Sequence, residues 1–275
     1  MRSVAIVGLG WLGFSLGRHL KNLGWVVKGS KRIQSDVEQM RLMRLEAYRL
    51  MLDPEIDSEP EDLSALLTVD CLVINIPPSQ YFFNVKDYIL GIKNLVNEAL
   101  NHGVQHFIFV SSTSVFPMKS GYFDEQQIPQ PDGEIGRGLL EIEQWLAMLP
   151  NIDCDIIRFA GLIGLARHPV YSLAGKTHLP HGNTPVNLVH LDDCVRAIEL
   201  LLDTPCGHRL YHLSAPNHPK KKDYYTNVAK KLALIVPHFV CLESDPIRII
   251  EGNKISQELG FVYQYPDPNL MIPIN

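Results

Sequence analysis

The stretch SVAIVGLGWLG, residues 3–13, decides how this chain folds. Its apolar, β-branched beginning predicts a buried strand at 4–7, and its end carries three glycines spaced G-x-G-x-x-G. A helical pattern with one apolar face follows and runs to about Leu23. A strand, a glycine turn and a helix in that order predict a turn that holds the phosphates of a dinucleotide.

Each part of this turn has its own expected task. Gly8 allows the tight turn, Gly10 lets the backbone approach a pyrophosphate, and Gly13 lets the helix pack closely on the strand. The first helical turn, which contains Trp11 and Leu12, supplies amide donors and the positive end of the helix dipole. A glycine-rich turn that binds no ligand is the simpler alternative.

The end of the second predicted strand, 25–29, indicates which dinucleotide binds. An NAD site usually has an acidic residue here, which accepts hydrogen bonds from the ribose. This sequence has Ser30, Lys31 and Arg32 instead. A hydroxyl and two cations suit a 2′-phosphate, because an acid would repel its charge and an arginine can bind it in a fork. We therefore predict NADP(H) in preference to NAD(H), with solvent-facing loop charges as the alternative.

Further along, short β-branched runs alternate with helical patterns. Val85–Asn101 has the 3.6-residue periodicity of a helix, and Ser35 with Glu38 forms a capping box that is expected to open another. Strands separated by segments of helix length indicate right-handed crossovers and a parallel sheet. The further predicted strands are 48–52, 71–76, 107–110 and 156–159, and a further helix is predicted at 138–149.

This alternation predicts an α/β fold, a Rossmann-type doubly wound parallel sheet with a small C-terminal substrate lobe. After residue 159 the elements become short and the loops are rich in Gly, Pro and His. We assign 1–164 with 187–216 to the NAD(P)-binding domain and 165–186 with 217–275 to the lobe. The segments 187–202 and 209–214 are expected to return to the main sheet.

Composition excludes several classes of protein. Of 275 residues, 46% are hydrophobic and 20% charged, and 25 basic against 30 acidic residues give a net charge of −5. Nucleic acids and anionic membranes need a concentrated basic surface, and no stretch reaches the roughly 18 to 20 apolar residues of a membrane helix. We expect a soluble protein with a small-molecule substrate and neither of those partners; a homodimer is left open.

The cysteines and histidines indicate the redox environment of the protein and whether it binds a metal. Five scattered cysteines without a C-x-x-C pair indicate a reduced cytoplasm and no metal cluster. The closest histidine pair, His178 and His181, lies in a Gly/Pro loop without a third ligand nearby in the sequence. We therefore predict no metal site.

Several longer motifs carry a resemblance. The segment HFIFVSSTSVFP, residues 106–117, is followed by FDE at 123–125, NLVHLDD at 187–193 and a C-terminal segment at 254–268. Together with the glycine turn, these motifs resemble the extended short-chain dehydrogenase/reductase superfamily of the epimerase/dehydratase type, over nearly the whole chain. The resemblance implies hydride transfer at a nicotinamide, with a Ser or Thr, a Tyr and a Lys as catalytic groups.

The same resemblance assigns site residues position by position. Ser112 takes the serine position, with Thr113 beside it. Asp53 stands where the family contacts adenine, and Gly161 and Leu162 stand where it closes over the nicotinamide. The remaining expected cofactor contacts are Ile76, Pro77, Pro78 and Ser111.

The resemblance breaks at the catalytic pair. In the frame of Y-G-R-S-K-L-E-A-E-R-L-L this chain reads IGRGLLEIEQWL, residues 135–146, so Ile135 replaces the tyrosine and Leu139 replaces the lysine. Neither side chain can move a proton. This departure resembles the atypical, YeeZ-type branch of the superfamily, which keeps the fold and the cofactor turn without the Y-x-x-x-K pair.

Two functions remain open from the sequence. The first is an oxidoreductase or nucleotide-sugar epimerase-like enzyme with a non-standard acid/base. Arg137 is the first candidate for an anion or carbonyl contact, and Tyr122, Asp124 and His190 are weaker candidates, for which a turn acid at Asp124 and a packed histidine at 190 are the simpler interpretations. The second is a catalytically silent NADP(H)-binding sensor or regulatory protein.

Overall fold

The computed structural model describes residues 2–78 and 84–273. The chain divides into two compact units, each of which is built from separated segments. The first unit comprises Met1–Val115, Pro131–Ile157 and Ala197–Leu210, and the second comprises Phe116–Gln130, Arg158–Arg196 and Tyr211–Asn275. The assignment of 165–186 and 217–275 to a substrate lobe stays a prediction.

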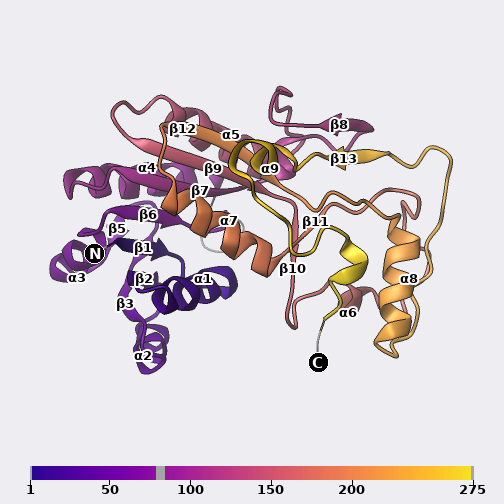
Figure 1. Cartoon of the computed structure of the whole chain (residues 1–275), viewed down its shortest axis with the longest axis horizontal. Coiled ribbons are helices and arrows are strands. Elements are labelled where there is room, and N and C mark those ends of the chain that lie inside the picture. The colour runs from indigo at the N-terminus through magenta and orange to yellow at the C-terminus, as the bar shows by residue number, and fades with distance from the viewer. Residues whose placement is uncertain (1, 79–83, 274–275) are drawn as a thin grey trace. The chain divides into compact units, whose positions relative to one another are not determined.

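A seven-stranded sheet with the order β12-β9-β7-β6-β1-β2-β3 forms the framework (Figure 1). The ladders that join β3, β2, β1, β6 and β7 are parallel. The chain runs outward from β1 to β3 and then crosses back to β6, so the strand order reverses between β1 and β6. This sheet confirms the predicted doubly wound α/β fold. The strands are β1 Ser3–Val7, β2 Val26–Lys31, β3 Glu46–Arg49, β6 Cys71–Ile74, β7 His106–Ser112, β9 Asp153–Phe159 and β12 His208–Leu213.

Helices cover both faces of this sheet, because crossovers that run in opposite directions from the switch point place their helices on opposite faces. The imidazole Nε2 of His19 in α1 lies 2.7 Å from the Glu199 carboxylate in α7, so these helices lie side by side. In α5, a Cβ on Gly138 would lie 2.4 Å from Val85 of α4, so α4 and α5 pack closely. These helices are α1 Trp11–Asn22, α2 Gln34–Leu42, α3 Pro60–Leu67, α4 Val85–Asn101, α5 Glu134–Ala147 and α7 Leu191–Asp203.

The central strands are buried on both faces. Val4 to Val7 of β1 and Leu72 to Ile74 of β6 have no exposed surface. Parallel strands that are covered by helices on both sides need such continuous apolar runs. The strand predictions at 4–7 and 107–110 are therefore confirmed, and the helix prediction Val85–Asn101 matches α4 at both ends.

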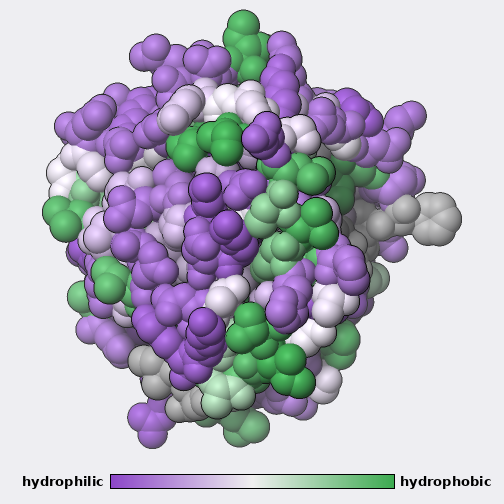
Figure 2. Space-filling view, turned by 90° about the vertical axis from the view of Figure 1, so that its right-hand side faces the viewer, coloured by the Kyte–Doolittle hydropathy of each residue, from purple (hydrophilic) through white to green (hydrophobic). Residues whose placement is uncertain are grey.

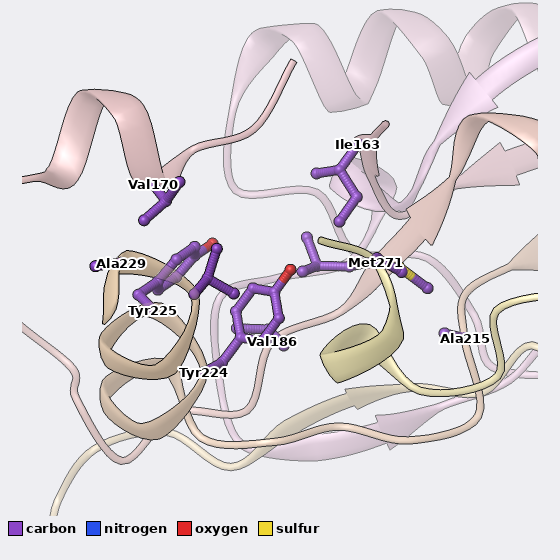
Figure 3. Close-up of a cluster of buried hydrophobic side chains, with 10 residues drawn as sticks. Ile163, Val170, Val186, Ala215, Tyr224, Tyr225, Ala229 and Met271 are labelled. Carbon is purple, nitrogen blue, oxygen red and sulfur yellow. The ribbon is translucent and has the colours of Figure 1, made fainter. Parts of the chain in front are cut away.

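The second unit is built from short elements around its own apolar cluster. Figure 3 shows Tyr224 and Tyr225 from α8 packed among Val170 of α6, Val186 and Met271. Figure 2 shows a face with scattered hydrophobic patches among hydrophilic residues. The elements outside the main sheet and its helices are β4 Met51–Leu52, β5 Ile56–Asp57, η1 Thr113–Val115, β8 Gly121–Phe123, β10 Gly161–Ile163, α6 Val170–Leu173, β11 Leu188–His190, α8 Lys221–Lys231, β13 Arg248–Ile250, α9 Lys254–Leu259 and η2 Pro268–Leu270.

Four local predictions were wrong. The strand predicted at 48–52 is interrupted, because β3 ends at Arg49 and β4 pairs with β5 outside the main sheet. The capping box fails because α2 begins at Gln34, which places Ser35 inside the helix; the N-cap is Ile33, in extended conformation and without a side-chain bond. The helix predicted at 138–149 begins earlier, at Glu134. The segment at 187–202 adds no strand to the main sheet, since β11 pairs with β10 instead; only its helix α7 lies on that sheet, beside α1. Arg209, by contrast, lies in β12 of the main sheet as predicted.

None of the helices in the described part of the chain is both long enough and apolar enough to cross a lipid bilayer.

Candidate functional site

The glycine turn lies at the carboxyl end of β1, beside the point where the strand order reverses. Gly8 has a φ of +106°, and a Cβ there would lie 2.5 Å from the carbonyl oxygen of Asn75. Both the backbone conformation and the lack of space exclude a side chain at this position. Open sheets of this kind bind their ligands at the carboxyl ends of the strands, at the switch point.

The other two glycines differ in what surrounds them. A Cβ on Gly13 would lie 2.2 Å from the carbonyl oxygen of Gly8, so the first turn of α1 can pack on the turn only without a side chain. A Cβ on Gly10 would meet nothing within 4 Å. Gly10 is also the N-cap of α1 and has no side-chain cap. A glycine beside open space at a helix N-terminus fits a backbone that an anion can approach.

Two polar side chains hold the turn from neighbouring strands. The hydroxyl of Ser30 in β2 accepts a hydrogen bond from the Gly8 amide at 3.2 Å, and the Ser30 carbonyl accepts one from the Leu9 amide at 2.9 Å. On the other side, Nδ2 of Asn75 donates to the Gly8 carbonyl at 3.1 Å. Asn75 was missed at the sequence level, where the one available signal was a polar residue that ends the apolar run of β6.

The cations predicted to bind a 2′-phosphate lie at the end of β2. Lys31 ends the strand, and its ammonium is 4.0 Å from the carboxylate of Asp36 in α2. Arg32 follows directly and is exposed. Lys28 is engaged elsewhere, because its ammonium donates to the carbonyls of Ala65 and Thr68. Lys31 and Arg32 therefore form the charged end of this strand.

The residues after β6 lie next to the turn. The side chain of Ile76 is 3.5 Å from the position of a Cβ on Gly8, and Pro77 and Pro78 follow it. The hydroxyl of the buried Tyr88 in α4 donates to the carbonyl of Ile76 at 3.1 Å, which fixes this segment. Asp53 is exposed in the turn between β4 and β5.

The three hydroxyl residues at the end of β7, Ser111, Ser112 and Thr113, lie in different environments. The hydroxyl of Ser111 is buried and donates to the carboxylate of Glu143 in α5 at 2.5 Å. Thr113 is buried in η1. Ser112 is half-buried, and its Oγ accepts a hydrogen bond from the Ser114 amide at 3.1 Å. Of these three hydroxyl groups, that of Ser112 has the most solvent access.

The two positions on α5 that the resemblance assigns to the tyrosine and the lysine occupy different environments. Ile135 is 41% exposed, whereas Leu139 is 2% exposed and belongs to the core. Arg137 is exposed, and its guanidinium donates to the Asp132 carbonyl at 3.2 Å. Ile135 and Arg137 are two positions apart in the sequence, which is about 200° around the helix axis. Arg137 therefore does not lie on the same face of α5 as Ile135.

The remaining candidates belong to the second unit. Gly161 and Leu162 form the start of β10, and Tyr122 is 68% exposed on β8. The carboxylate of Asp124 accepts hydrogen bonds from the amides of Gln126 and Gln127, which confirms the interpretation as a turn acid. His190 ends β11 and packs against Tyr265 with ring centroids 3.9 Å apart and the ring planes tilted by 37°, and its burial lowers the pKa of the imidazole.

Metal ligands do not gather in the described ranges 2–78 and 84–273: no three His, Cys, Asp or Glu side chains there are placed to hold an ion together. His178 contacts the Thr177 hydroxyl and His181 contacts the buried carboxylate of Asp245, at 3.3 Å.

The seven-stranded sheet defines a Rossmann-type doubly wound α/β fold, and solved structures share that fold. The complex of MoeE5 with UDP-glucose and NAD has a TM-score of 0.78 at 18% identity and covers 98% of this chain and 96% of its own. The UDP-glucose 4-epimerase of Thermotoga maritima, solved with UDP-glucose, has a TM-score of 0.78 at 16% identity, over 98% and 97%. No family model matches the chain.

A sequence comparison gives the family. Protein YeeZ of Escherichia coli K12 is 44% identical over 272 residues, which cover 98% of this chain and 99% of that protein. The chain therefore belongs to the family of protein YeeZ.

Proposed function

We propose that this protein binds NADP(H) at the turn that Gly8, Gly10 and Gly13 form. The observation that carries the proposal is the contrast between the three glycines: two are tightly enclosed, and the space over Gly10 is open at the N-terminus of α1. That arrangement suits a pyrophosphate, which needs backbone amides and a close approach. The amides of Trp11 and Leu12 in the first turn of α1 would then face the phosphates.

The preference for NADP(H) over NAD(H) rests on Lys31 and Arg32. No acidic side chain stands at the end of β2, where an NAD site usually carries one. A 2′-phosphate would gain charge-assisted hydrogen bonds from the guanidinium of Arg32. Ser30 contributes indirectly, because its hydroxyl holds the Gly8 amide.

For the reaction, we propose an oxidoreductase or epimerase-like activity on a small hydroxyl or carbonyl compound, a class that includes nucleotide sugars. The bound nicotinamide supplies hydride transfer. Ser112, the most exposed of the three residues, would orient the substrate oxygen with Thr113 beside it, and Ser111 would lie against the cofactor. Arg137 would contact an anionic or carbonyl group from α5. Segments 165–186 and 217–275 would supply the substrate lobe, and Gly161 and Leu162 would contact the nicotinamide half.

The cofactor's ribose and adenine are proposed to contact the ends of neighbouring strands. Ile76, Pro77 and Pro78 follow β6 and would line the riboses. Asp53, exposed in the turn between β4 and β5, would contact the adenine.

A second candidate function is a silent NADP(H)-binding sensor or regulatory protein. The environment of Leu139 favours it, because the position of the catalytic lysine has become part of the core. Ile135 likewise offers no proton donor in place of the tyrosine. A chain that keeps the turn and loses both groups can bind a dinucleotide without turning it over.

One experiment separates these functions. Purified protein is titrated with NADPH and NADH by nucleotide fluorescence and is then screened for loss of absorbance at 340 nm with aldehydes, ketones and nucleotide sugars. Turnover that Ser112→Ala abolishes supports the enzyme. Tight NADPH binding without turnover supports the sensor, and failure to bind either nucleotide overturns both.

A further inference from the structure

Asn75 joins the carboxyl ends of β6 and β1. Its main-chain amide donates to the carbonyl of Val7 at 2.9 Å and so extends the parallel ladder by one residue. Its side-chain amide donates to the carbonyl of Gly8, the first residue after β1, at 3.1 Å. One residue therefore holds two consecutive carbonyls at the start of the turn.

The Gly8 carbonyl has little room for another partner. A Cβ on Gly13 would lie 2.2 Å from this oxygen, so the first turn of α1 packs directly on it. The side-chain nitrogen of Asn75 is itself 3.2 Å from the same position. Gly8 is half-buried, and an enclosed carbonyl that loses its hydrogen bond costs up to about 1–3 kcal/mol of stability. The side-chain amide of Asn75 is the donor that supplies this bond.

Ser30 completes the restraint from the other side. It accepts hydrogen bonds from the amides of Gly8 and Leu9, through its hydroxyl and its carbonyl. Two amides and one carbonyl of the turn are therefore bonded to strands on both sides of β1. The Gly8–Leu9 peptide is therefore held at both its carbonyl and its amide, one residue before Gly10, where the space is open.

We propose that Asn75 is a positioning residue for dinucleotide binding: its side-chain amide sets the orientation of the turn that presents the amides of α1 to the pyrophosphate. The inference rests on the proposed function. Because NADH and NADPH share the pyrophosphate, Asn75 acts on both nucleotides equally, whereas Arg32 distinguishes between them.

The test uses two substitutions that remove the donor. Asn75→Leu replaces the amide by an apolar group of similar size, and Asn75→Asp replaces it by a carboxylate. Both variants are expected to weaken NADH and NADPH by the same factor, at least tenfold, with the ratio of the two affinities unchanged. Asn183→Leu is the matched control, since the Asn183 amide also donates to a main-chain carbonyl, that of Leu242, at 3.1 Å.

A pH series adds a signature that a structural defect alone would not give. The carboxyl introduced by Asn75→Asp regains a donor when it is protonated, so its NADH affinity is expected to recover toward the wild type between pH 7 and pH 4.5. The leucine variant shows no such recovery. Urea unfolding of each variant shows that the binding assay uses folded protein.

The outcomes are distinct. If the wild type binds neither nucleotide, the proposed function and this inference both fail. If the wild type binds and both Asn75 variants bind equally well, only the role of Asn75 is overturned. A loss confined to NADPH, or a loss in the aspartate variant that low pH does not reverse, also overturns it.

Discussion

The imidazole Nε2 of His106 in β7 lies 2.8 Å from the carboxylate of Asp155 in β9, and Arg209 of β12 binds the same carboxylate through Nε and Nη2. On the other side of the ring, Nδ1 is 3.5 Å from the thiol of Cys71 in β6. The order thiol, imidazole, carboxylate is that of a nucleophilic triad. Burial raises the pKa of the Cys71 thiol to about 12, however, so the thiol stays protonated. We therefore interpret Cys71, His106 and Asp155 as a structural group.

Asp155→Asn is expected to destabilise the protein by about 3 kcal/mol, because Arg209 then lacks its carboxylate in a buried setting. Urea unfolding followed by circular dichroism measures the change. Asp57→Asn is the matched control: Asp57 also binds an arginine, Arg49, through two oxygens, but it is exposed, and its substitution should leave the unfolding midpoint unchanged. Equal effects of the two substitutions would refute the buried role of Asp155.

The glycines of the turn are expected to separate stability from binding. Gly13→Ala places a methyl group 2.2 Å from the Gly8 carbonyl and should destabilise the fold by about 1–3 kcal/mol. Gly10→Ala enters open space at a φ of −76°, so the free energy of unfolding should stay within about 0.5 kcal/mol of the wild type. Its NADPH affinity should fall at least about tenfold, about 1.4 kcal/mol. Unchanged binding by Gly10→Ala would place the dinucleotide elsewhere.

Arg32→Ala tests the choice of cofactor. Charge-assisted hydrogen bonds contribute about 1.5–3 kcal/mol, so NADPH affinity should fall roughly tenfold to a hundredfold while NADH affinity changes less than about twofold. Fluorescence titration with both nucleotides measures this. Lys28→Ala is the control cation on the same strand, because its ammonium is bonded to the carbonyls of Ala65 and Thr68. Equal losses for the two nucleotides would contradict a 2′-phosphate site.

The two replaced catalytic positions should respond differently to truncation. Leu139→Ala removes fully buried carbons and is expected to cost about 2–4 kcal/mol of unfolding free energy. Ile135→Ala, on the exposed first turn of α5, should cost less than about 0.5 kcal/mol. Denaturant unfolding compares them. A small effect at Leu139 would show that this position is still available to a ligand.

Acid should weaken the second unit through His168. Burial lowers the pKa of this imidazole to about 4, from an ordinary value of 6.5. Its Nδ1 accepts a hydrogen bond from the Val170 amide, so its Nε2 donates to the Tyr224 hydroxyl at 2.7 Å. A group whose folded pKa is depressed stabilises the fold above 6.5, and this contribution is lost as pH falls toward 4, at up to about 1.4 kcal/mol per pH unit.

Urea unfolding between pH 7.5 and pH 4.5 measures this loss. His168→Gln should flatten the pH dependence, whereas His238→Gln, at an exposed histidine, should leave it as in the wild type. Parallel curves for His168→Gln and the wild type would exclude His168 as the titrating group.

Much of the framework was predictable because its signals are local. The glycine spacing after an apolar run fixed the first strand, turn and helix, and the periodicity of Val85–Asn101 gave α4 at both ends. The first turn of α2 was predicted wrongly, because a capping-box pattern is short and the turn after β2 starts the helix one residue before Ser35.

Partners that are distant in the sequence could not be predicted. The motif around Ser111 predicts a cofactor contact. In the structure the hydroxyl of Ser111 donates to Glu143, which is 32 residues away in the sequence. Asn75 carries no motif, and its task depends on lying beside Gly8 in the neighbouring strand. Residue type defines which bonds a side chain can make, and the packing of strands and helices selects the partner.

The sequence by itself determined the alternation of strands and helices in the main sheet and the glycine turn, because these depend on residue identity and short-range periodicity. Only the tertiary structure decided that Leu139 is core while Ile135 is exposed, and that Ser30 and Asn75 hold the turn from both sides. Those facts depend on which strands become neighbours in the sheet. The order of the strands in the sheet is set by the burial of apolar residues over the whole sheet.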